Sequence, residues 1–410
     1  MQIKTRFPEG FYWGAATASY QVEGGIENTD WNKAAREGRV PVCGRACDHY
    51  NRFEADFDLA KELGHNAHRF SVEWARIEPE EGKFDESEIE HYREVLKALR
   101  ARNIEPFITL WHFTLPLWFS EKGGFERNDS PEIFARYCAY VVEKLGDLCL
   151  SYSTINEALP LTSNGWRRGT WPPFKKWPGI DSVGVPTYSN FHEAKVQTGL
   201  KNILKYFKVL RTLARAHNTA YDAIKAVVPK AEVGIVHHAI LFHSNSNPLN
   251  KLKAKLMNWH WTHQHLRRVS KKCDSIGLNY YLHKKFGETA HYQKTDMDWD
   301  VYPEGIYETL KMLWRYKKPI YITEAGVADH DDDIRADYIK RQVEATGKAI
   351  ADGVDVRGHM YWSLLDNYEW ALGFEKRFGL IEINYDTLER KIRPSAYVYK
   401  AIIEQNGVVE

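Results

Sequence analysis

The chain has 410 residues, of which 43% are hydrophobic and 27% charged, and its 56 basic and 55 acidic side chains leave a formal charge of +1. This is the composition of a soluble globular protein with a sizeable core. The near-zero charge argues against a nucleic-acid or acidic-membrane role, because such proteins usually carry a basic excess or stripe.

The amino-terminal residues and the cysteines bear on the compartment. The first residues, MQIKTRFPEGFYWG, lack the apolar segment of a signal peptide, and no apolar run approaches the roughly 20 residues of a membrane span. The five cysteines are odd in number and widely scattered, so a disulfide framework is not expected. We therefore predict a cytoplasmic protein with no membrane span.

Eight short runs rich in β-branched and aromatic residues recur along the chain and are typical of strands. They occupy residues 11–18, 66–74, 105–113, 148–158, 231–241, 274–281, 318–326 and 356–366. Segments with helical periodicity separate them, for example 86–103, 130–147 and 336–353. Eight strands alternating with helices predict an α/β fold, a single (β/α)8 TIM barrel with long βα loops.

Local signals refine this prediction. Asp129-Ser130-Pro131 is a cap followed by a proline, which favours a helix start, and Gly353 favours a helix end. The segment 160–195, rich in Trp, Pro and Gly, indicates a long loop. No linker or repeat divides the chain, so residues 1–410 are predicted to form one domain.

The predicted strands end in polar and often acidic residues. Chemistry in such barrels is found at the carboxyl ends of the strands. The fourth and seventh runs end in Glu157 and Glu324. These two strands are three apart in a ring of eight, so the two side chains can face each other across the mouth. Other polar residues near strand ends are Glu73, Arg76, His112, Asn156, Asn279, Tyr281, Asp366, Asn367 and Glu369.

Two carboxylates in polar and aromatic surroundings indicate acid/base work on a neutral polyol. One must keep its proton near neutrality while the other stays ionised, which requires different environments. Arg69, inside the second predicted strand, can hold one of them as an anion. The alternative is that both glutamates only form ion pairs at the starts of loops. Two glutamates at strand ends, with polar and aromatic residues around them, favour a catalytic role over that alternative.

Several motifs, in order from Phe11 to Tyr399, resemble glycoside hydrolase family 1, the β-glucosidase and β-galactosidase group. They are FYWGAATASYQVEGG, HRFSVEWARIEPEEGKFD, TLWHFTLPLWF, STINEA, GLNYY, YITEAGVAD, YWSLLDNYEWALGFEKRFGL and TLERKIRPSAYVY. Within the family the chain resembles the short archaeal β-glycosidases, with which HFTLPLWF and the WPPF at 171–174 agree.

The resemblance implies a role for each site residue. Glu324 is expected to be the nucleophile and Glu157 the acid/base of a retaining mechanism, with carboxyl groups about 5 Å apart. Arg69 and Tyr281 are expected to hold Glu324 ionised, with Asn279 as further support. The expected sugar-binding residues are Gln21, His112, Asn156, Tyr281, Trp362, Glu369, Trp370 and Phe378. An anionic Glu369 would repel a phosphorylated sugar, so unphosphorylated glycosides are expected.

The chain departs from the family pattern at two positions. Ala158 follows Glu157 where the family usually has Pro, and Ala325 follows Glu324 where it usually has Asn. The first change removes a backbone constraint and the second a polar side chain. The short spacing between the two glutamates also predicts trimmed loops on the leaving-group side.

Other clusters do not indicate a metal or cofactor. His260, His263 and His265 lack the HExxH arrangement and are read as a mixed helix surface. Cys43 and Cys47 have no second half-site, and no glycine-rich phosphate loop is evident. We therefore expect no cofactor and no metal.

The sequence predicts a retaining β-glycosidase for unphosphorylated β-D-glycosides, small or oligosaccharide. A β-glucosidase is favoured, with β-galactosidase, β-mannosidase or β-fucosidase side activities. The alternatives are a transglycosylase of the same family and a sugar-binding relative that has lost catalysis. Sugar configuration, leaving-group preference and oligomeric state stay open.

Overall fold

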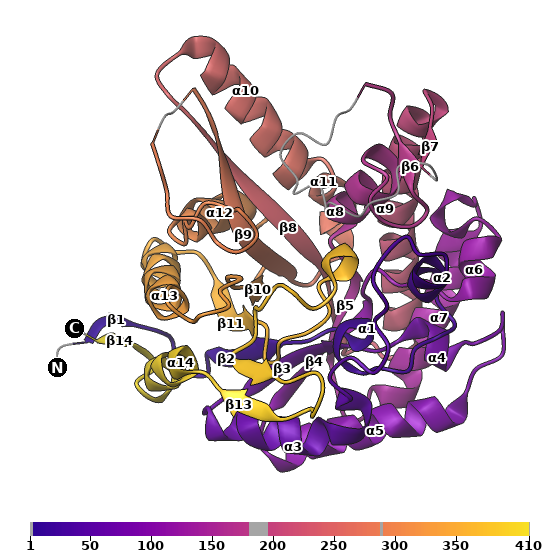
Figure 1. Cartoon of the computed structure of the whole chain (residues 1–410), viewed down its shortest axis with the longest axis horizontal. Coiled ribbons are helices and arrows are strands. Elements are labelled where there is room, and N and C mark those ends of the chain that lie inside the picture. The colour runs from indigo at the N-terminus through magenta and orange to yellow at the C-terminus, as the bar shows by residue number, and fades with distance from the viewer. Residues whose placement is uncertain (1–2, 180–195, 288–289, 410) are drawn as a thin grey trace.

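The computed structural model describes residues 3–179, 196–287 and 290–409. Its centre is a closed barrel of parallel strands in the order β10-β11-β2-β3-β4-β5-β8-β9 (Figure 1). The bounds are β2 (Tyr12–Ala16), β3 (Ala67–Ser71), β4 (Glu105–Trp111), β5 (Ser151–Asn156), β8 (Glu232–Ser244), β9 (Ile276–Phe286), β10 (Ile320–Ala325) and β11 (Val356–Trp362). Each predicted strand coincides with one barrel strand, and the predicted (β/α)8 barrel is confirmed.

Helices surround the barrel (Figure 1). The longer ones are α3 (His49–Glu62), α5 (Glu86–Ala101), α7 (Ser130–Leu145), α9 (Lys201–Val227), α10 (Pro248–Asn258), α12 (Gly305–Leu313), α13 (Arg335–Ala351) and α14 (Pro394–Glu404). Short helices are α1 (Ser19–Val22), α2 (Asp30–Arg36), α4 (Trp74–Ile77), α6 (Leu117–Glu121), α8 (Ala158–Thr162) and α11 (Leu266–Val269). Helix α5, for example, buries an apolar face that includes Val95, Leu96 and Leu99.

Within the described residues, three two-stranded pairs lie outside the barrel. They are β1 (Ile3–Arg6) with β14 (Gly407–Val409), β12 (Ile381–Ile383) with β13 (Arg390–Ile392), and β6 (Lys175–Lys176) with β7 (Gln197–Thr198). The first pair is antiparallel and joins the two ends of the described chain beside α14 (Figure 1).

The predicted start of α7 and end of α13 are at the correct positions, but the predicted side-chain cap of α7 is not formed. Helix α7 begins at Ser130 with Pro131 in its first turn, as predicted. The Asp129 side chain, however, does not cap the helix, and instead pairs with Arg127, with 2.8 Å between its Oδ1 and Arg127 Nε. Gly353 follows α13 with φ of +86°, the left-handed backbone that commonly ends a helix.

The segment predicted as a long loop is partly helical. Residues Ala158–Thr162 form α8, and a π-helical turn, Ser163–Arg167, continues from it. Leu159, Leu161 and Trp166 are buried, so packing overrides the loop-like composition. Residues 180–195 of the predicted loop lie outside the described residues.

The lower barrel is filled by side chains. Ala67, Phe107 and Tyr321, from the first halves of β3, β4 and β10, form a buried cluster with Met360 of β11. A filled amino-terminal half leaves the carboxyl ends of the strands as the place for a site.

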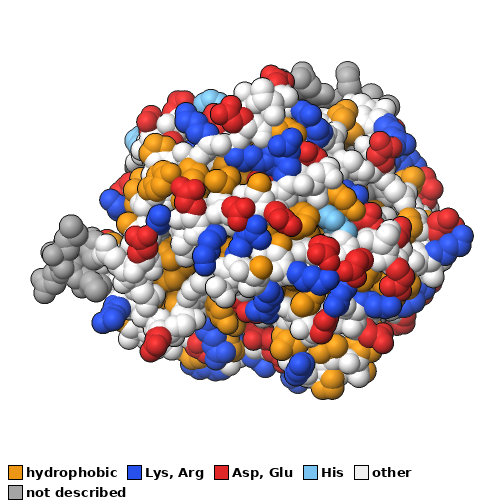
Figure 2. All heavy atoms as spheres, turned by 90° about the horizontal axis from the view of Figure 1, so that it is seen from below, with side chains coloured by type: hydrophobic (Ala, Val, Ile, Leu, Met, Phe, Trp, Pro, Cys, Tyr) orange, Lys and Arg blue, Asp and Glu red, His pale blue; other side chains and the backbone are white. Residues whose placement is uncertain are grey.

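The molecular surface carries both charge signs. On the face shown in Figure 2, acidic and basic side chains are interspersed. Exposed pairs such as Lys97–Glu94 on α5, 2.6 Å between Nζ and Oε1, contribute to that pattern. Across 3–179, 196–287 and 290–409, no helix is both long and apolar enough to cross a membrane.

Candidate active site

Glu324 is buried at the end of β10 and both its carboxylate oxygens are engaged. Arg69 of β3 donates from Nη1 to Oε1 at 2.5 Å, and the Tyr281 hydroxyl of β9 donates to Oε2 at 2.6 Å. Both bonds are charge-assisted and favour the anion over the neutral acid. The carboxylate is therefore fixed in orientation by β9, the neighbour of β10, and by β3, which is three strands away from β10 in the barrel order.

The charge state of Glu324 results from opposing effects. Burial raises the pKa of this carboxyl above its ordinary value, and the nearby Glu157 adds to the rise. The Arg69 guanidinium and the Tyr281 hydroxyl lower the pKa by stabilising the ionised form. The two donors are thus what make a buried anion tolerable here.

Arg69 is itself held from two more strands. Its Nε donates to Thr109 Oγ1 of β4 at 2.9 Å, and its Nη2 donates to Asn156 Oδ1 of β5 at 2.8 Å. The Arg69 side chain is 2% exposed. A buried guanidinium that donates to three different side chains is held in one orientation. It therefore also fixes the positions of the Glu324 and Asn156 side chains.

Glu157 follows β5 in a left-handed conformation, with φ of 47° and ψ of 62°. This backbone is unfavourable for a residue with a Cβ, and such strain is concentrated at functional sites. Asn279 Nδ2 donates to Glu157 Oε1 at 2.7 Å, and His238 Nδ1 lies 3.1 Å from the same oxygen. In the part of the chain that the structure describes, both contacts fall on Oε1, which leaves Oε2 for a substrate.

The predicted support of Glu324 by Asn279 is wrong. Asn279 is opposite Glu324 in the β9–β10 register, but its amide nitrogen contacts Glu157 and its oxygen accepts from Thr323 Oγ1 at 2.8 Å. Thr323 orients the amide across the barrel toward β5. Asn279 is therefore a partner of the other glutamate.

The structure brings the remaining predicted residues into one pocket at the barrel mouth. The pocket has about 1230 Å³ of empty space, part of it open to solvent. Its lining includes Gln21, His112, Asn156, Glu157, Tyr281, Glu324, Trp362, Glu369, Trp370 and Phe378. Arg69 and Asn279 lie beneath this lining, in contact with the two glutamates.

Three lining residues, Gln21, His112 and Ser163, have a buried polar side-chain atom without a hydrogen-bond partner among the described residues. Gln21 Nε2 donates to Asn367 Oδ1 at 2.9 Å, whereas Gln21 Oε1 has no hydrogen bond. His112 Nε2 lies 3.2 Å from Asn156 Nδ2, whereas His112 Nδ1 has none. Buried polar atoms are normally satisfied, so these are positioned for a ligand with hydroxyl groups.

Glu369 has an unusual environment at the inner end of the pocket. Burial, with added repulsion from Glu324 and Glu157, raises the pKa of Glu369 to about 8. The raised pKa favours the protonated carboxyl, so the predicted repulsion of a phosphorylated sugar by Glu369 is a weaker argument than the sequence suggested. A protonated carboxyl can both donate to and accept from a sugar hydroxyl.

Sequence reasoning missed several residues of the pocket. His238 of β8 contacts Glu157, and its ring stacks on Tyr281 with centroids 6.0 Å apart. The only signal was the pair His237-His238 inside an otherwise apolar run. Aromatic residues that were not predicted also line the pocket, namely Phe113, Trp171, Trp261 and Trp299.

The two departures from the family pattern lie outside the pocket lining. Ala325 is fully buried in the core behind β10, because side chains alternate along a strand and Glu324 takes the inward position. Ala158 begins α8, and Pro160 restricts the backbone two residues later. Gly326 is the tighter constraint, because a Cβ there would lie 2.0 Å from Trp362 O.

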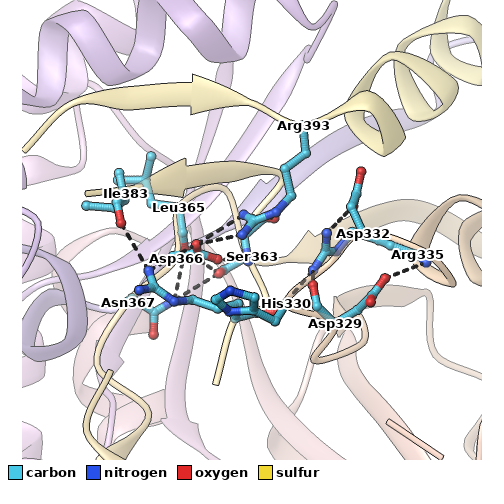
Figure 3. Close-up of polar contacts among 12 residues, drawn as sticks. Asp329, His330, Asp332, Arg335, Ser363, Leu365, Asp366, Asn367, Ile383 and Arg393 are labelled. Carbon is cyan, nitrogen blue, oxygen red and sulfur yellow. Dashed lines mark hydrogen bonds and ion pairs between the residues drawn. The ribbon is translucent and has the colours of Figure 1, made fainter. Parts of the chain in front are cut away.

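A buried polar network fixes the loops beyond β10 and β11 (Figure 3). Asp329 accepts from the backbone N–H of Arg335 at 2.9 Å, and Asp332 pairs with the Arg335 guanidinium. Asp366 accepts from Arg393 Nη1 at 3.0 Å. Through Asn367, which contacts Gln21, this network reaches the pocket.

Three histidines, His260, His263 and His265, were predicted to lie on a mixed helix surface rather than to bind a metal. His265 is buried, and His260 and His263 are partly exposed, so the predicted mixed helix surface is wrong for His265. A search of the described residues finds no group of three His, Cys, Asp or Glu side chains that could hold a metal. All five cysteines are buried and free.

Comparison with known proteins gives consistent matches over the whole chain. The model of glycosyl hydrolase family 1 matches residues 3–274 and 269–408. A 1,4-beta-D-glucan glucohydrolase from Thermotoga neapolitana is 31% identical, covering 99% of this chain and 100% of the relative. A beta-galactosidase from Sulfolobus acidocaldarius is 30% identical, covering 98% and 96%.

Solved structures show the same similarity. A beta-glycosidase from Pyrococcus horikoshii is 35% identical, with a TM-score of 0.88 over 99% of this chain and 96% of that one. A family 1 beta-glucosidase from Thermotoga maritima is 30% identical, with a TM-score of 0.88 over 99% and 100%.

Proposed function

The chain belongs to glycosyl hydrolase family 1 and is a β-glycosidase, and we propose that it cleaves unphosphorylated β-D-glucosides with Glu324 as nucleophile and Glu157 as acid/base. One observation carries the assignment of roles. Three carboxyl groups line the pocket, those of Glu157, Glu324 and Glu369, and among the described residues only Glu324 is paired with an arginine or a lysine, Arg69.

In the first step Glu324 attacks the anomeric carbon and the bond to the leaving oxygen breaks. Glu157 gives its proton to that oxygen, so the leaving group departs as a neutral alcohol. The negative charge of Glu324 is consumed in the new covalent bond. Arg69 and Tyr281 hold the attacking carboxylate in one orientation, which lowers the entropic part of the barrier.

In the second step Glu157 removes a proton from an incoming water, which attacks the same carbon and releases Glu324. Two displacements give net retention of configuration. Asn156, fixed by Arg69 and adjacent to Glu157, is positioned to bind the sugar beside the reacting carbon. Gln21 Oε1, His112 Nδ1 and Glu369 supply further groups for the sugar hydroxyls.

Rescue with azide tests the two roles separately. Glu324→Gly should lose hydrolysis of 4-nitrophenyl β-glucoside, and azide should restore turnover with an α-glucosyl azide product, because a single displacement inverts. Glu157→Ala with azide should give the β-glucosyl azide, because the covalent intermediate still forms.

Glu73→Gln is a matched control, since Glu73 is a buried carboxyl outside the pocket lining. It should yield no azide product. Wild-type activity in both pocket variants would contradict the assignment. A majority of transfer product with a modest concentration of added alcohol would favour a transglycosylase.

A further inference from the structure

The pocket continues outward beyond the two glutamates along β8 and β9. Ile240 is two residues beyond His238, and Lys284 is three residues beyond Tyr281. At about 3.3 Å per residue, Lys284 is about 10 Å farther along β9 than Tyr281, in the direction of the mouth. Residues of the segment after Glu157, among them Ser163, Asn164 and Arg168, also line the pocket.

This outer part is where a leaving group lies under the proposed function. The inner end holds Gln21, His112 and Glu369, which serve the sugar. Glu157 protonates the oxygen of the leaving group, so the leaving group extends past Glu157 toward the mouth. Its walls there are apolar at Ile240, Trp261 and Leu282.

Two cations line the outer part and lack an acidic partner among the described residues. The Arg168 side chain has one hydrogen bond, from Nη1 to Asn164 Oδ1 at a long 3.5 Å. Lys284 makes neither an ion pair nor a hydrogen bond within the described ranges, and Arg167, next to Arg168, has a buried Nε without a partner.

The electrostatics agree with this geometry. Burial, with the neighbouring Arg167, lowers the pKa of Arg168 to about 10. Burial also lowers the pKa of Lys284, and Arg168 and Arg167 add to that effect. Cations are thus gathered where water is reduced, a costly arrangement that a bound anion would relieve.

The next residue on β9 provides a contrast. Lys285 Nζ lies 3.4 Å from Asp300 Oδ2 and donates to Ala290 O at 2.6 Å. It is not part of the pocket lining. Outside the pocket, therefore, the lysine of this strand is paired, and inside it the lysine is not.

We propose that the pocket selects β-glycosides whose leaving group carries an anionic substituent, which Arg168 and Lys284 bind at the outer end. The inference rests on the proposed function and names its substrate class. The apolar walls between the glutamates and the cations fit an aromatic or aliphatic spacer of about 10 Å or less. The anion is a carboxylate, sulfate or phosphate group.

The test compares two substrates that differ only in charge. They are the 4-(carboxymethyl)phenyl and 4-(carbamoylmethyl)phenyl β-D-glucosides, whose phenols have similar acidity. The wild-type enzyme should favour the carboxylate in kcat/KM by about fivefold at low salt, the effect of a partly exposed ion pair. The 4-(phosphonomethyl)phenyl glucoside shows whether phosphate is preferred over carboxylate.

Substitutions of Arg168, Lys284 and Lys285 show which residues cause the preference for the carboxylate substrate. The double variant Arg168→Gln, Lys284→Gln should bring the ratio near one, and Lys284→Arg should keep the preference. Lys285→Gln, the matched control, should keep the wild-type ratio. Because each ratio is measured within one protein, partial loss of folded enzyme cancels. Added salt should lower the wild-type ratio, since screening weakens an exposed charge pair.

Two results would overturn the inference while leaving the proposed function intact. One is a wild-type ratio of one or less, with 4-nitrophenyl β-glucoside still hydrolysed. The other is an unchanged ratio in the double variant. Absence of turnover for every glycoside, the neutral ones included, refutes the proposed function and this inference with it.

Discussion

The hydroxyl of Tyr281 offers the sharpest test of how Glu324 is kept ionised. Tyr281→Phe removes one donor, 2.6 Å from Glu324 Oε2, and retains the ring that packs in the pocket. Arg69 remains in place on the other carboxylate oxygen. The variant therefore isolates one of the two bonds that stabilise the anion.

The expected change in the pKa of Glu324 follows from the charge on the hydrogen-bond acceptor. A hydrogen bond to a charged group contributes about 1.5–3 kcal/mol, and one pKa unit corresponds to about 1.4 kcal/mol. The bond stabilises the ionised form, so removing it raises the pKa of Glu324 by about one to two units. Activity requires the ionised form of Glu324. As the pH is lowered, the variant should therefore lose activity at a higher pH than the wild type does.

The assay is kcat/KM for 4-nitrophenyl β-glucoside from pH 4 to 8. The acid limb of Tyr281→Phe should lie about one to two units above that of the wild type, with a loss of tenfold or more on the acid side. Tyr280→Phe is the matched control, since the Tyr280 hydroxyl donates to Tyr302 O at 2.8 Å and is not in the pocket. An acid limb that stays in place or moves to lower pH would refute the reasoning.

Four other changes have expected outcomes. Asn279→Ala, which removes a 2.7 Å bond to Glu157, should reduce kcat/KM for an alkyl glucoside at least tenfold more than for 4-nitrophenyl glucoside, because only the poor leaving group needs protonation; equal losses would contradict the contact. Glu369→Gln should flatten the change in KM between pH 7 and 9, since the pKa of Glu369 is about 8 in the wild type; a variant that keeps the wild-type slope would show that another group titrates. Burial raises the pKa of Glu73 to about 7, so between pH 4.5 and 7 the native state binds a proton that the unfolded state does not, and the free energy of unfolding falls as the pH rises. Urea unfolding should show that this fall is about 3 kcal/mol smaller in Glu73→Gln than in the wild type. The same pH dependence in both proteins would contradict this prediction. Gly326→Ala should lower activity at least tenfold and lower Tm, because its Cβ would meet Trp362 O at 2.0 Å; wild-type kinetics would exclude this constraint.

The order of strands and helices was predictable because it depends on local periodicity. The run that ends in Glu324 and the run that ends in Glu157 both read as strands from their own residues. Parallel strands then place their carboxyl ends at one mouth, so the two glutamates were expected to meet before any contact was known. Their separate roles came from the family motifs rather than from that periodicity.

The contacts that distinguish the two glutamates were not predictable in the same way. Asn279 was assigned to Glu324, its ladder neighbour, yet its side chain bonds Glu157. His238 was overlooked inside an apolar run. The helical segment after Glu157 was read as a loop, because its packing partners are remote in sequence.

The sequence by itself determined the barrel, the positions of its strand ends and the pair of carboxylates, because each of these follows from short-range pattern. Only the tertiary structure decided that Asn279 and His238 contact Glu157, and where cations without an acidic partner among the described residues line the pocket. Arg69 and Glu324 are 255 residues apart, and closure of the barrel brings them to 2.5 Å. Burial, which raises the pKa of Glu324, is likewise a property of the closed barrel and not of any segment.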